Sequence, residues 1–224
     1  MTGQGRGHWL ADETIDFTSK PTAASHIGGI AWDLAQTVLL AVAIFLGIRV
    51  VIQNFKVEGT SMEPSLHNGQ YLIVIKAAYA RIDGTPFANI LVRGTQPPPQ
   101  TPVYLLGEPS RGDIAVFLSP TPGERDFIKR IIGVPGDKVE VKSGVTYLNG
   151  TALTEPYIRG PANYEVAPEV VPSGYYFVLG DNRPNSSDSH VWGFLPAGNL
   201  IGKAWLSYWP PPEWGLVPTV QLAG

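Results

Sequence analysis

The sequence predicts a mainly antiparallel β protein preceded by one transmembrane helix. Three observations favour this class: a long apolar run near the amino terminus, several short β-branched segments after it, and 25 glycines and 21 prolines among 224 residues. Short strands divided by turn residues are typical of antiparallel sheets, whereas frequent glycine and proline disfavour long helices. We therefore expect one membrane anchor and one β-rich domain.

The composition also limits the function. Charged residues make up 16% of the chain, against ~25% in typical soluble domains. The formal net charge of -3 gives no sign of a nucleic-acid partner. Because the chain has no cysteine, disulfides, a cysteine nucleophile and thiolate metal sites are excluded. His8, His26 and His67 do not have metal-ligand spacing, so neither a metal nor an organic cofactor is expected.

The apolar run extends from Ile30 to Ile52 and is expected to form a transmembrane signal anchor over residues 30–53. Its uncharged part, Leu34 to Ile48, is short on its own. With Asp33 and Arg49 placed at the interfaces, the run reaches the ~20 residues that a bilayer core requires. A buried amphipathic helix is the alternative. A cleaved signal peptide fits poorly, because no Ala-x-Ala site follows the run.

The expected strands are short segments rich in β-branched and aromatic residues, each bounded by turn residues. Two of them form a hairpin around Ser143-Gly144. All fall within a β-rich domain assigned to residues 54–209. The expected strands are Tyr71–Ile75, Ile114–Leu118, Phe127–Val134, Val139–Val141, Val145–Leu148, Tyr175–Leu179 and Ala204–Trp209.

Four segments are expected to lie outside this sheet. Residues 77–110 have weak periodicity and contain three consecutive prolines, which indicates an insertion or a long loop. Glu155–Pro172, with scattered Pro and Gly, indicates a second loop. Three further prolines open residues 210–224, which are expected to form a tail without regular structure. Residues 1–29 are expected to form a disordered amino-terminal tail.

Two separate segments carry the candidate chemistry. Ser61 follows the apolar run, and Lys129 stands within the apolar segment Phe127–Ile132. Burial disfavours the charged form of a lysine and lowers its pKa, and a neutral amine can take a proton from a serine hydroxyl. The sequence therefore predicts a membrane-tethered Ser/Lys hydrolase. Taken separately, Ser61 is also compatible with an ordinary turn serine and Lys129 with a lysine that extends to solvent.

A Ser-His-Asp triad is an alternative, because His190 follows closely after Asp188. The Gly-x-Ser-x-Gly turn that carries the nucleophile in many such enzymes is missing around Ser61. We therefore prefer Lys129 as the base.

Four blocks of the sequence resemble, in order, the motifs of bacterial signal peptidase I, a membrane-bound Ser/Lys endopeptidase that removes signal peptides from exported proteins. The last block reads Gly-Asp-Asn-Arg-Pro-Asn-Ser-Ser-Asp-Ser-His-Val-Trp-Gly. The blocks are Gly59–Leu66, Arg111–Phe117, Asp126–Asp137 and Gly180–Gly193. The resemblance covers Ile30 to Trp209. It implies a mainly β catalytic domain on the extracytoplasmic side of the cytoplasmic membrane, with signal-peptide-bearing preproteins and the lipid bilayer as partners.

The charges that flank the anchor do not settle this orientation. Lys20 is offset by acidic residues, whereas Arg49 and Lys56 follow the run. The positive-inside rule therefore mildly favours the opposite orientation.

The resemblance implies roles for individual residues. Ser61 matches the nucleophile and Lys129 the general base. Ser186 matches a second serine that hydrogen-bonds the lysine and directs its amine toward Ser61.

Three charged residues match the supporting positions of the family. Asp181 and Asp188 match the acidic residues of the last block. The resemblance implies that Asp181 pairs with Arg130 and braces the site.

The resemblance also places the substrate-binding residues. Val57, Met62, Leu66 and Ile128 match positions beside two small pockets, which in the family accept small side chains and lead to cleavage after Ala-x-Ala. Many members place a hydroxyl at the position of Gly59, where it holds the oxyanion. Here the oxyanion hole is expected at Gly59 and Ser61 and is expected to depend more on main-chain N–H groups, chiefly that of Ser61.

Two further positions depart from the family. Pro184 stands where an acidic residue or Asn is common, and His190 where some members have Arg. Two other function classes stay open: a membrane-anchored β domain that binds partners without catalysis, and a self-cleaving Ser/Lys protease of the repressor type. The second would carry a DNA-binding helix-turn-helix rather than an anchor.

Overall fold

The structure, a computed structural model, describes residues 23–82, 102–121, 123 and 125–223. Contacts divide the chain into two units, Met1–Leu46 and Gly47–Gly224, and each is considered by itself.

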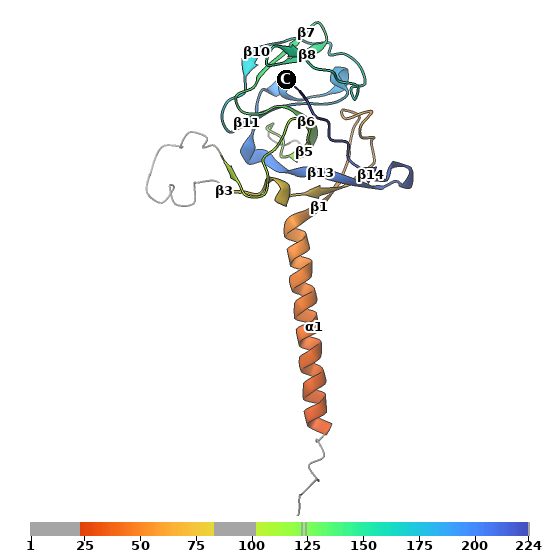
Figure 1. Cartoon of the computed structure of the whole chain (residues 1–224). Helices are drawn as coiled ribbons and strands as arrows, with labels where there is room; N and C mark the ends of the chain where they lie inside the picture. Colours follow the sequence, from red (N-terminus) through yellow and green to blue (C-terminus); the bar gives the residue numbers. More distant parts are fainter. Residues whose placement is uncertain (1–22, 83–101, 122, 124, 224) are drawn as a thin grey trace, which may run out of the picture. The chain divides into compact units, whose positions relative to one another are not determined.

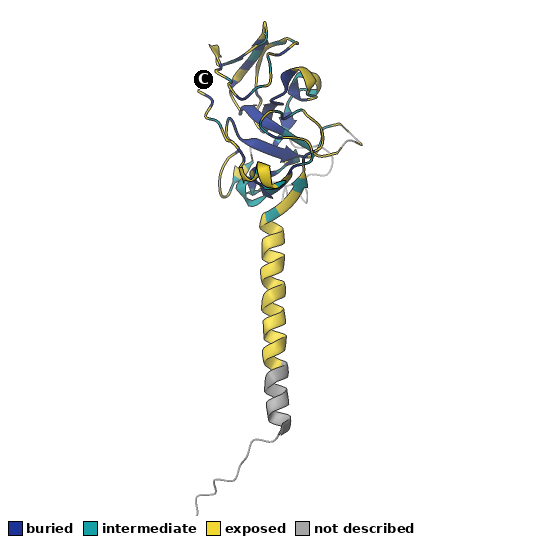
Figure 2. Cartoon of the chain, turned by 90° about the vertical axis from the view of Figure 1, so that its right-hand side faces the viewer, coloured by how far each residue is buried: buried dark blue, intermediate teal, exposed yellow. Residues whose placement is uncertain are grey.

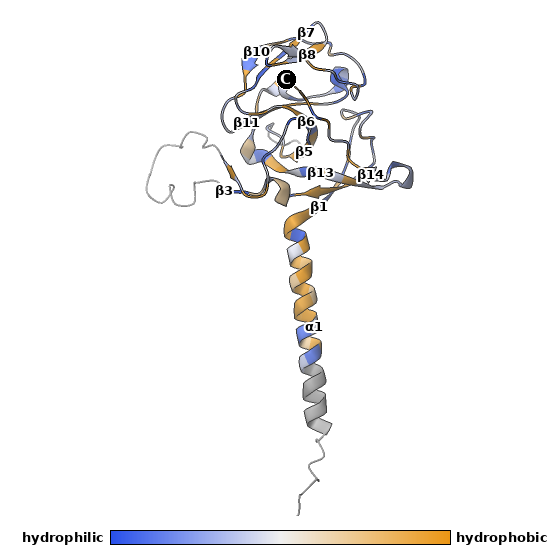
Figure 3. Ribbon diagram, in the orientation of Figure 1, coloured by the Kyte–Doolittle hydropathy of each residue, from blue (hydrophilic) through white to orange (hydrophobic). Residues whose placement is uncertain are grey.

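Helix α1 runs from Ala23 to Val51. Its part Trp32–Val51, 20 residues, is long and apolar enough to cross a bilayer and buries none of its length. Figure 2 shows this stretch exposed and Figure 3 shows it largely hydrophobic. A helix that is apolar on all sides fits a membrane span. The candidate span lies within the expected anchor, residues 30–53, but the helix itself begins earlier, at Ala23 within the expected tail, and it ends at Val51, before a strand that starts at Ile52.

The main sheet lies in the second unit. Its strand order is β1-β2-β13-β5-β6-β11-β12, with β14 paired to β13 (Figure 1). Neighbouring strands are antiparallel. The strands are β1 (Ile52–Lys56), β2 (Tyr71–Ile75), β5 (Ile114–Phe117), β6 (Phe127–Gly133), β11 (Tyr175–Leu179), β12 (Leu195–Pro196), β13 (Leu200–Trp209) and β14 (Gly215–Leu216).

A smaller antiparallel sheet has the order β10-β7-β8-β9. In Figure 1 its labelled strands lie at the end of the second unit opposite β1 and β13. Its strands are β7 (Lys138–Lys142), β8 (Val145–Leu148), β9 (Thr151–Ala152) and β10 (Val166–Val170); a third, two-stranded sheet holds β3 (Arg81–Ile82) and β4 (Val103–Tyr104). Short helical turns are η1 (Ala77–Tyr79), η2 (Arg183–Asn185), α3 (Ser189–Trp192), η3 (Ala197–Asn199) and η4 (Pro211–Glu213).

The buried side chains form three clusters that follow from strand alternation. In β7, for example, Val139 and Val141 are fully buried while their neighbours face outward, the period of two that a half-buried strand requires. One cluster lies between the small sheet and the strands β6 and β11, and a second lies around β5, β11 and η1. The third lies beneath the Ser61 turn and contains Val57, Met62, Leu66, Leu72, Ile114, Ala204 and Val217.

The predicted mainly antiparallel β class is confirmed, and each expected strand is present. Strand β13 begins at Leu200, earlier than predicted, and β1, β3, β4, β9, β10, β12 and β14 were not predicted. Glu155–Pro172, expected as a loop, contains β10. Both ends of the expected insertion have structure, since η1 buries Tyr79 and the Tyr104 hydroxyl lies 2.8 Å from that of Tyr176. Residues 83–101, with their three prolines, lie outside the described residues.

The prediction that residues 210–224 form a tail is wrong. Strand β14 pairs with β13, and the segment Val217–Leu222, here called the C-terminal strap, buries Val217 in one core cluster and Leu222 in another. Proline ends a strand because it lacks an N–H donor, but it does not prevent the chain beyond it from packing.

Candidate active site

Ser61 lies in a turn that follows β1. The main chain of Val57 still bonds to Gln70 and Gly69, at 2.8 and 2.9 Å, just beyond the paired residues Lys56 and Tyr71. The chain then turns, and the side chains of Met62 and Leu66 enter the core below it. This burial fixes the turn from beneath and leaves the Ser61 side chain half-buried at its surface.

Asn182 holds the same turn from the fourth motif block. Its main-chain N–H donates to the carbonyl of Ser61 over 2.9 Å, and its side-chain amide donates to the carbonyl of Thr60 over 3.0 Å. Sequence reasoning missed this residue, although its place next to Asp181 within the block was an available signal. The turn that carries Ser61 is therefore attached to the segment after β11 by two hydrogen bonds.

Lys129 reaches Ser61 from β6, where it pairs with Ala115 of β5. The side chain is 3% exposed, and its Nζ lies 2.6 Å from Oγ of Ser61. Burial lowers the pKa of Lys129 to about 8, from an ordinary 10.5, although Asp188 and then Asp181 act in the opposite direction. A lysine and a serine at this separation and in this setting can exchange a proton near neutral pH.

Arg130, the next residue, is completely buried and bonded on every side. Its Nε and Nη2 donate to the two carboxylate oxygens of Asp181 over 2.9 and 2.7 Å, which is the pair that the resemblance implied. Its remaining donors meet the carbonyls of Gly112 and Pro218 at 2.9 and 3.2 Å and the hydroxyl of Ser65 at 3.3 Å. A buried arginine is tolerated only with such full pairing.

Ser186 differs from its expected arrangement. Among the described residues its buried Oγ has no hydrogen-bond partner, so the bond to Lys129 that the resemblance implied is not formed. The hydroxyl lies instead over Gly180, where a Cβ would come within 2.2 Å of Ser186 Oγ and 2.6 Å of the Ser61 carbonyl oxygen. Only glycine at position 180 lets Ser61 and Ser186 approach each other so closely.

His190 does not complete a triad with Ser61. Its Nδ1 lies 2.7 Å from Asp188, whose other oxygen accepts the N–H of Gly180 over 2.8 Å. The His190 ring stacks on Tyr164, with ring centroids 3.7 Å apart. Within the described part of the chain, the side chain bonded to the Ser61 hydroxyl is Lys129.

The expected oxyanion donors have different surroundings. The N–H of Gly59 donates to Asn68 Oδ1 over 3.0 Å, so in this structure it is engaged within its own turn. The N–H of Ser61 has no acceptor among the described residues and remains available.

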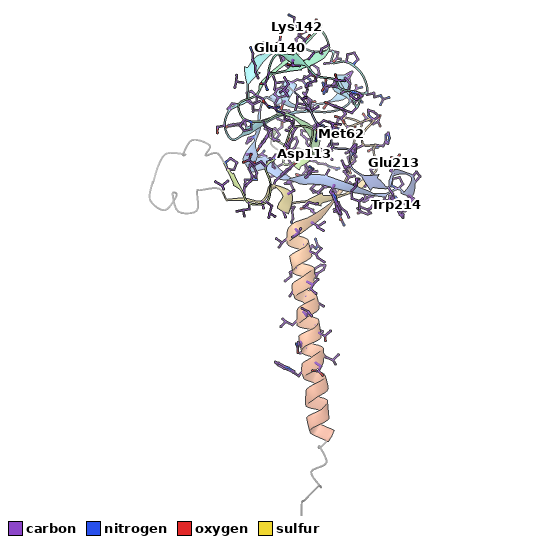
Figure 4. All side chains as sticks on the ribbon, viewed as in Figure 1. Met62, Asp113, Glu140, Lys142, Glu213 and Trp214 are labelled. Carbon is purple, nitrogen blue, oxygen red and sulfur yellow. The ribbon has the colours of Figure 1, made fainter. Side chains whose placement is uncertain are left out.

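A cavity of about 730 Å³ opens beside Ser61 and Lys129. Val57 and Ile128 line it as expected, but Met62 and Leu66 do not, because both side chains point into the core. Four apolar residues that the sequence did not single out also line it: Phe55, Leu72, Val116 and Phe127. Figure 4 labels Met62 beside the strands of the main sheet.

Charged and polar side chains also line the cavity. They include the ion pair between Glu58 and Arg125 and the side chains of Asn185 and Ser187. The described residues contain no group of three or more His, Cys, Asp or Glu side chains that could hold a metal ion.

The chain matches known proteins over most of its length. A family model described as signal peptidase, peptidase S26, matches residues 31–209. The probable signal peptidase I-2 of Synechocystis sp. is 39% identical, over 83% of this chain and 76% of that protein. The signal peptidase I of Leptolyngbya laminosa is 37% identical over 78% of each chain, and that of Bacillus amyloliquefaciens is 31% identical over 85% of this chain and 93% of that protein. The chain therefore belongs to the signal peptidase family, peptidase S26.

Proposed function

We propose that this member of the signal peptidase family is a membrane-anchored serine endopeptidase in which Ser61 is the nucleophile and Lys129 the general base. The observation that carries the proposal is the 2.6 Å contact between Lys129 Nζ and Ser61 Oγ at the edge of an open cavity. Burial, which keeps a fraction of the amine neutral near pH 7, supports the role of base.

The reaction divides into two steps through an acyl-enzyme. Neutral Lys129 takes the proton of the Ser61 hydroxyl as the oxygen attacks the scissile carbonyl, and the N–H of Ser61 stabilises the oxyanion. The ammonium of Lys129 then gives its proton to the departing amine. In the second step Lys129 takes a proton from water, and the hydroxide oxygen attacks the ester carbonyl. The ammonium of Lys129 then returns this proton to the Ser61 oxygen as the ester bond breaks, which releases the carboxyl product and restores the Ser61 hydroxyl and the neutral amine.

The substrates are preproteins that carry signal peptides, cleaved after small residues of the Ala-x-Ala type. The walls of the cavity at Val57 and Ile128 are apolar and belong to a packed core, so they resist displacement by a larger side chain. Steric exclusion of this kind is effective, whereas one methylene in an apolar pocket is worth only about 1–3 kcal/mol. The supporting residues are Arg130, Asp181 and Asp188. Arg130, which follows Lys129 in the chain, pairs with Asp181, and Asp188 accepts the N–H of Gly180 at the end of β11.

We place the protein in the cytoplasmic membrane as a single-pass protein with its catalytic unit on the extracytoplasmic side. Helix α1 supports the membrane location by length and composition. The assignment of the catalytic unit to the extracytoplasmic side of the membrane is based on the family resemblance, since signal peptides are removed after export.

The test is cleavage of a preprotein with an Ala-x-Ala site in detergent. Ser61→Ala and Lys129→Ala should each lose at least about 10³-fold in kcat/KM, because each removes a group that acts in the transition state. Lys142→Ala is the matched control, since Lys142 is exposed on the small sheet (Figure 4) and should retain wild-type activity. Thermal unfolding of each variant verifies that it is folded. Cleavage by Lys129→Ala would disprove the mechanism.

A further inference from the structure

The connection from β9 to β10 is built around the candidate site. The residues from Glu155 to Tyr164, here called the brace, contact the first, third and fourth motif blocks at short intervals. In order, Glu155 contacts Arg183, Tyr157 contacts Arg130, Arg159 contacts Asp181 and Glu63, Gly160 contacts Asn182, and Tyr164 contacts His190. A simple connection between two strands does not require these contacts.

Two side chains in the first half of the brace, those of Glu155 and Tyr157, are buried. The carboxylate of Glu155 accepts two hydrogen bonds from Arg183, at 2.5 and 3.1 Å, and one from the Tyr157 hydroxyl at 2.7 Å. The Tyr157 ring lies 4.3 Å from the guanidinium carbon of Arg130. Because Arg130 directly follows Lys129, these contacts fix the brace relative to the base.

Arg159 extends the brace to the nucleophile. Its main-chain N–H donates to the carbonyl of Asp181 over 2.9 Å, and its guanidinium forms an ion pair with Glu63, two residues after Ser61. The main chain of Arg159 is thus anchored on the fourth block while its side chain holds the first. The main chain of this arginine is already fixed. Its side chain therefore loses less conformational freedom on forming an ion pair than the side chain of an arginine on a mobile surface loop.

The contacts close a ring that contains both reacting groups. Ser61 and Glu63 belong to one turn, Glu63 pairs with Arg159, Arg159 bonds to Asp181, and Asp181 pairs with Arg130 next to Lys129. Asn182 closes the ring by its bond to the Ser61 carbonyl. We propose that Arg159 is a positioning residue for the Ser61–Lys129 pair, acting through Glu63. This inference rests on the proposed function and adds to it a residue outside the four motif blocks.

The expected effect falls on kcat. Exposed ion pairs contribute little to stability, and the side chain of Arg159 is 56% exposed, so its loss should leave the unfolding temperature nearly unchanged. A small displacement of the nucleophile turn is costly for the chemical step. We therefore expect Arg159→Gln and Glu63→Gln to lower kcat about tenfold with KM changed less than about twofold.

The experiment uses the full chain in detergent and the Ala-x-Ala preprotein. We compare the wild type, Arg159→Gln, Arg159→Lys, Glu63→Gln, Glu63→Arg, and the charge exchange that combines Glu63→Arg with Arg159→Glu. Lys142→Gln is the matched control for loss of an exposed positive charge. Arg159→Lys keeps the charge and should lose less than Arg159→Gln, and the charge exchange should recover activity relative to Glu63→Arg alone.

The outcomes separate this inference from the proposed function. A lowered kcat with unchanged KM and unfolding temperature, partly restored in the charge exchange, supports Arg159 as a positioning residue. If the wild type cleaves and Arg159→Gln behaves like Lys142→Gln, the inference is overturned while the function stands. The inference is also overturned if kcat falls only in variants whose unfolding temperature falls as well, and if the charge exchange does not restore kcat. If the wild type does not cleave, the function and this inference fall together.

Discussion

Lys129 is buried, and the two nearby carboxylates, those of Asp181 and Asp188, already form hydrogen bonds with other groups. Two nitrogen atoms of Arg130 hold Asp181, and Asp188 accepts the N–H of Gly180 and contacts His190. Both carboxylates raise the pKa of Lys129, but burial outweighs them and leaves it at about 8. The site therefore depends more on keeping water away from the amine than on either acid.

The low pKa of Lys129 predicts a rate that rises with pH through about 8. Only the neutral amine accepts the Ser61 proton, so lowering the pKa enlarges the reactive fraction. At pH 7 about 9% of Lys129 is neutral with a pKa of about 8, against about 0.03% with the ordinary value of 10.5. Below pH 7, kcat/KM for preprotein cleavage should fall about tenfold for each pH unit, which a pH–rate profile measures.

His190→Ala is the control for this profile, because a histidine base would also produce a fall in acid. If the acid limb persists in His190→Ala, the titrating group is not His190. A rate that stays constant through the acid range in the wild type would contradict a lysine base.

At the scale of elements, the C-terminal strap is part of the catalytic unit. The Pro218 carbonyl accepts a hydrogen bond from Arg130, and the Val220 carbonyl oxygen lies where a Cβ on Gly112 would stand, at 1.7 Å. Gly112 also has a φ of +85°, which favours glycine. The second motif block and the strap therefore fit together only because residue 112 lacks a side chain.

Gly112→Ala should destabilise the protein far more than a matched glycine change. Gly150 has nearly the same φ, +86°, but a Cβ there meets nothing within 4 Å. Gly150→Ala should cost about 1–2 kcal/mol for its backbone conformation alone. Gly112→Ala adds the displacement of the strap, about 1–3 kcal/mol more. Denaturant unfolding measures both free energies, and equal losses would show that the strap does not pack on Gly112.

At the scale of elements, the sequence predicted those strands whose limits are set by local residue pattern. The strands Tyr71–Ile75 and Tyr175–Leu179 are found with the predicted limits, because β-branched and aromatic runs between turn residues specify a buried strand. Strand β1 was merged with the apolar helix that precedes it, and β10 was missed because its residues, Val-Ala-Pro-Glu-Val, are mostly exposed.

The candidate site was predictable only in part. Ser61 and Lys129 stand in motifs, and a lysine in an apolar strand suggests a lowered pKa. The packing of Met62 and Leu66 into the core, the engagement of Gly59 by Asn68 and the pairing of Arg159 with Glu63 depend on contacts between distant segments. Local pattern carries no information on such contacts, so they required the structure.

At the scale of the whole molecule, the candidate membrane span and the catalytic unit share one continuous chain without a linker. Helix α1 ends at Val51, strand β1 begins at Ile52, and the Val51 carbonyl accepts the N–H of Lys76 over 2.8 Å. Under the proposed function, the enzyme is held at the membrane by α1 and its substrates are held there by an apolar signal segment. Tethering both partners to one surface raises their effective concentration.

The anchor is tested by placing charge in the middle of α1. The double variant Leu40→Arg with Ile44→Arg should leave the membrane fraction, because each arginine near the centre of a span costs about 2.5–3.5 kcal/mol of insertion free energy. Leu40→Val with Ile44→Val is the control, since it keeps the helix apolar. Carbonate extraction of membranes measures the partition, and protection of the catalytic unit from added protease in intact cells reports its side. Retention of the arginine variant in extracted membranes would show that α1 is not the anchor. The side chains of Leu40 and Ile44 are both exposed in the structure, so these substitutions test insertion into the membrane rather than packing within the protein.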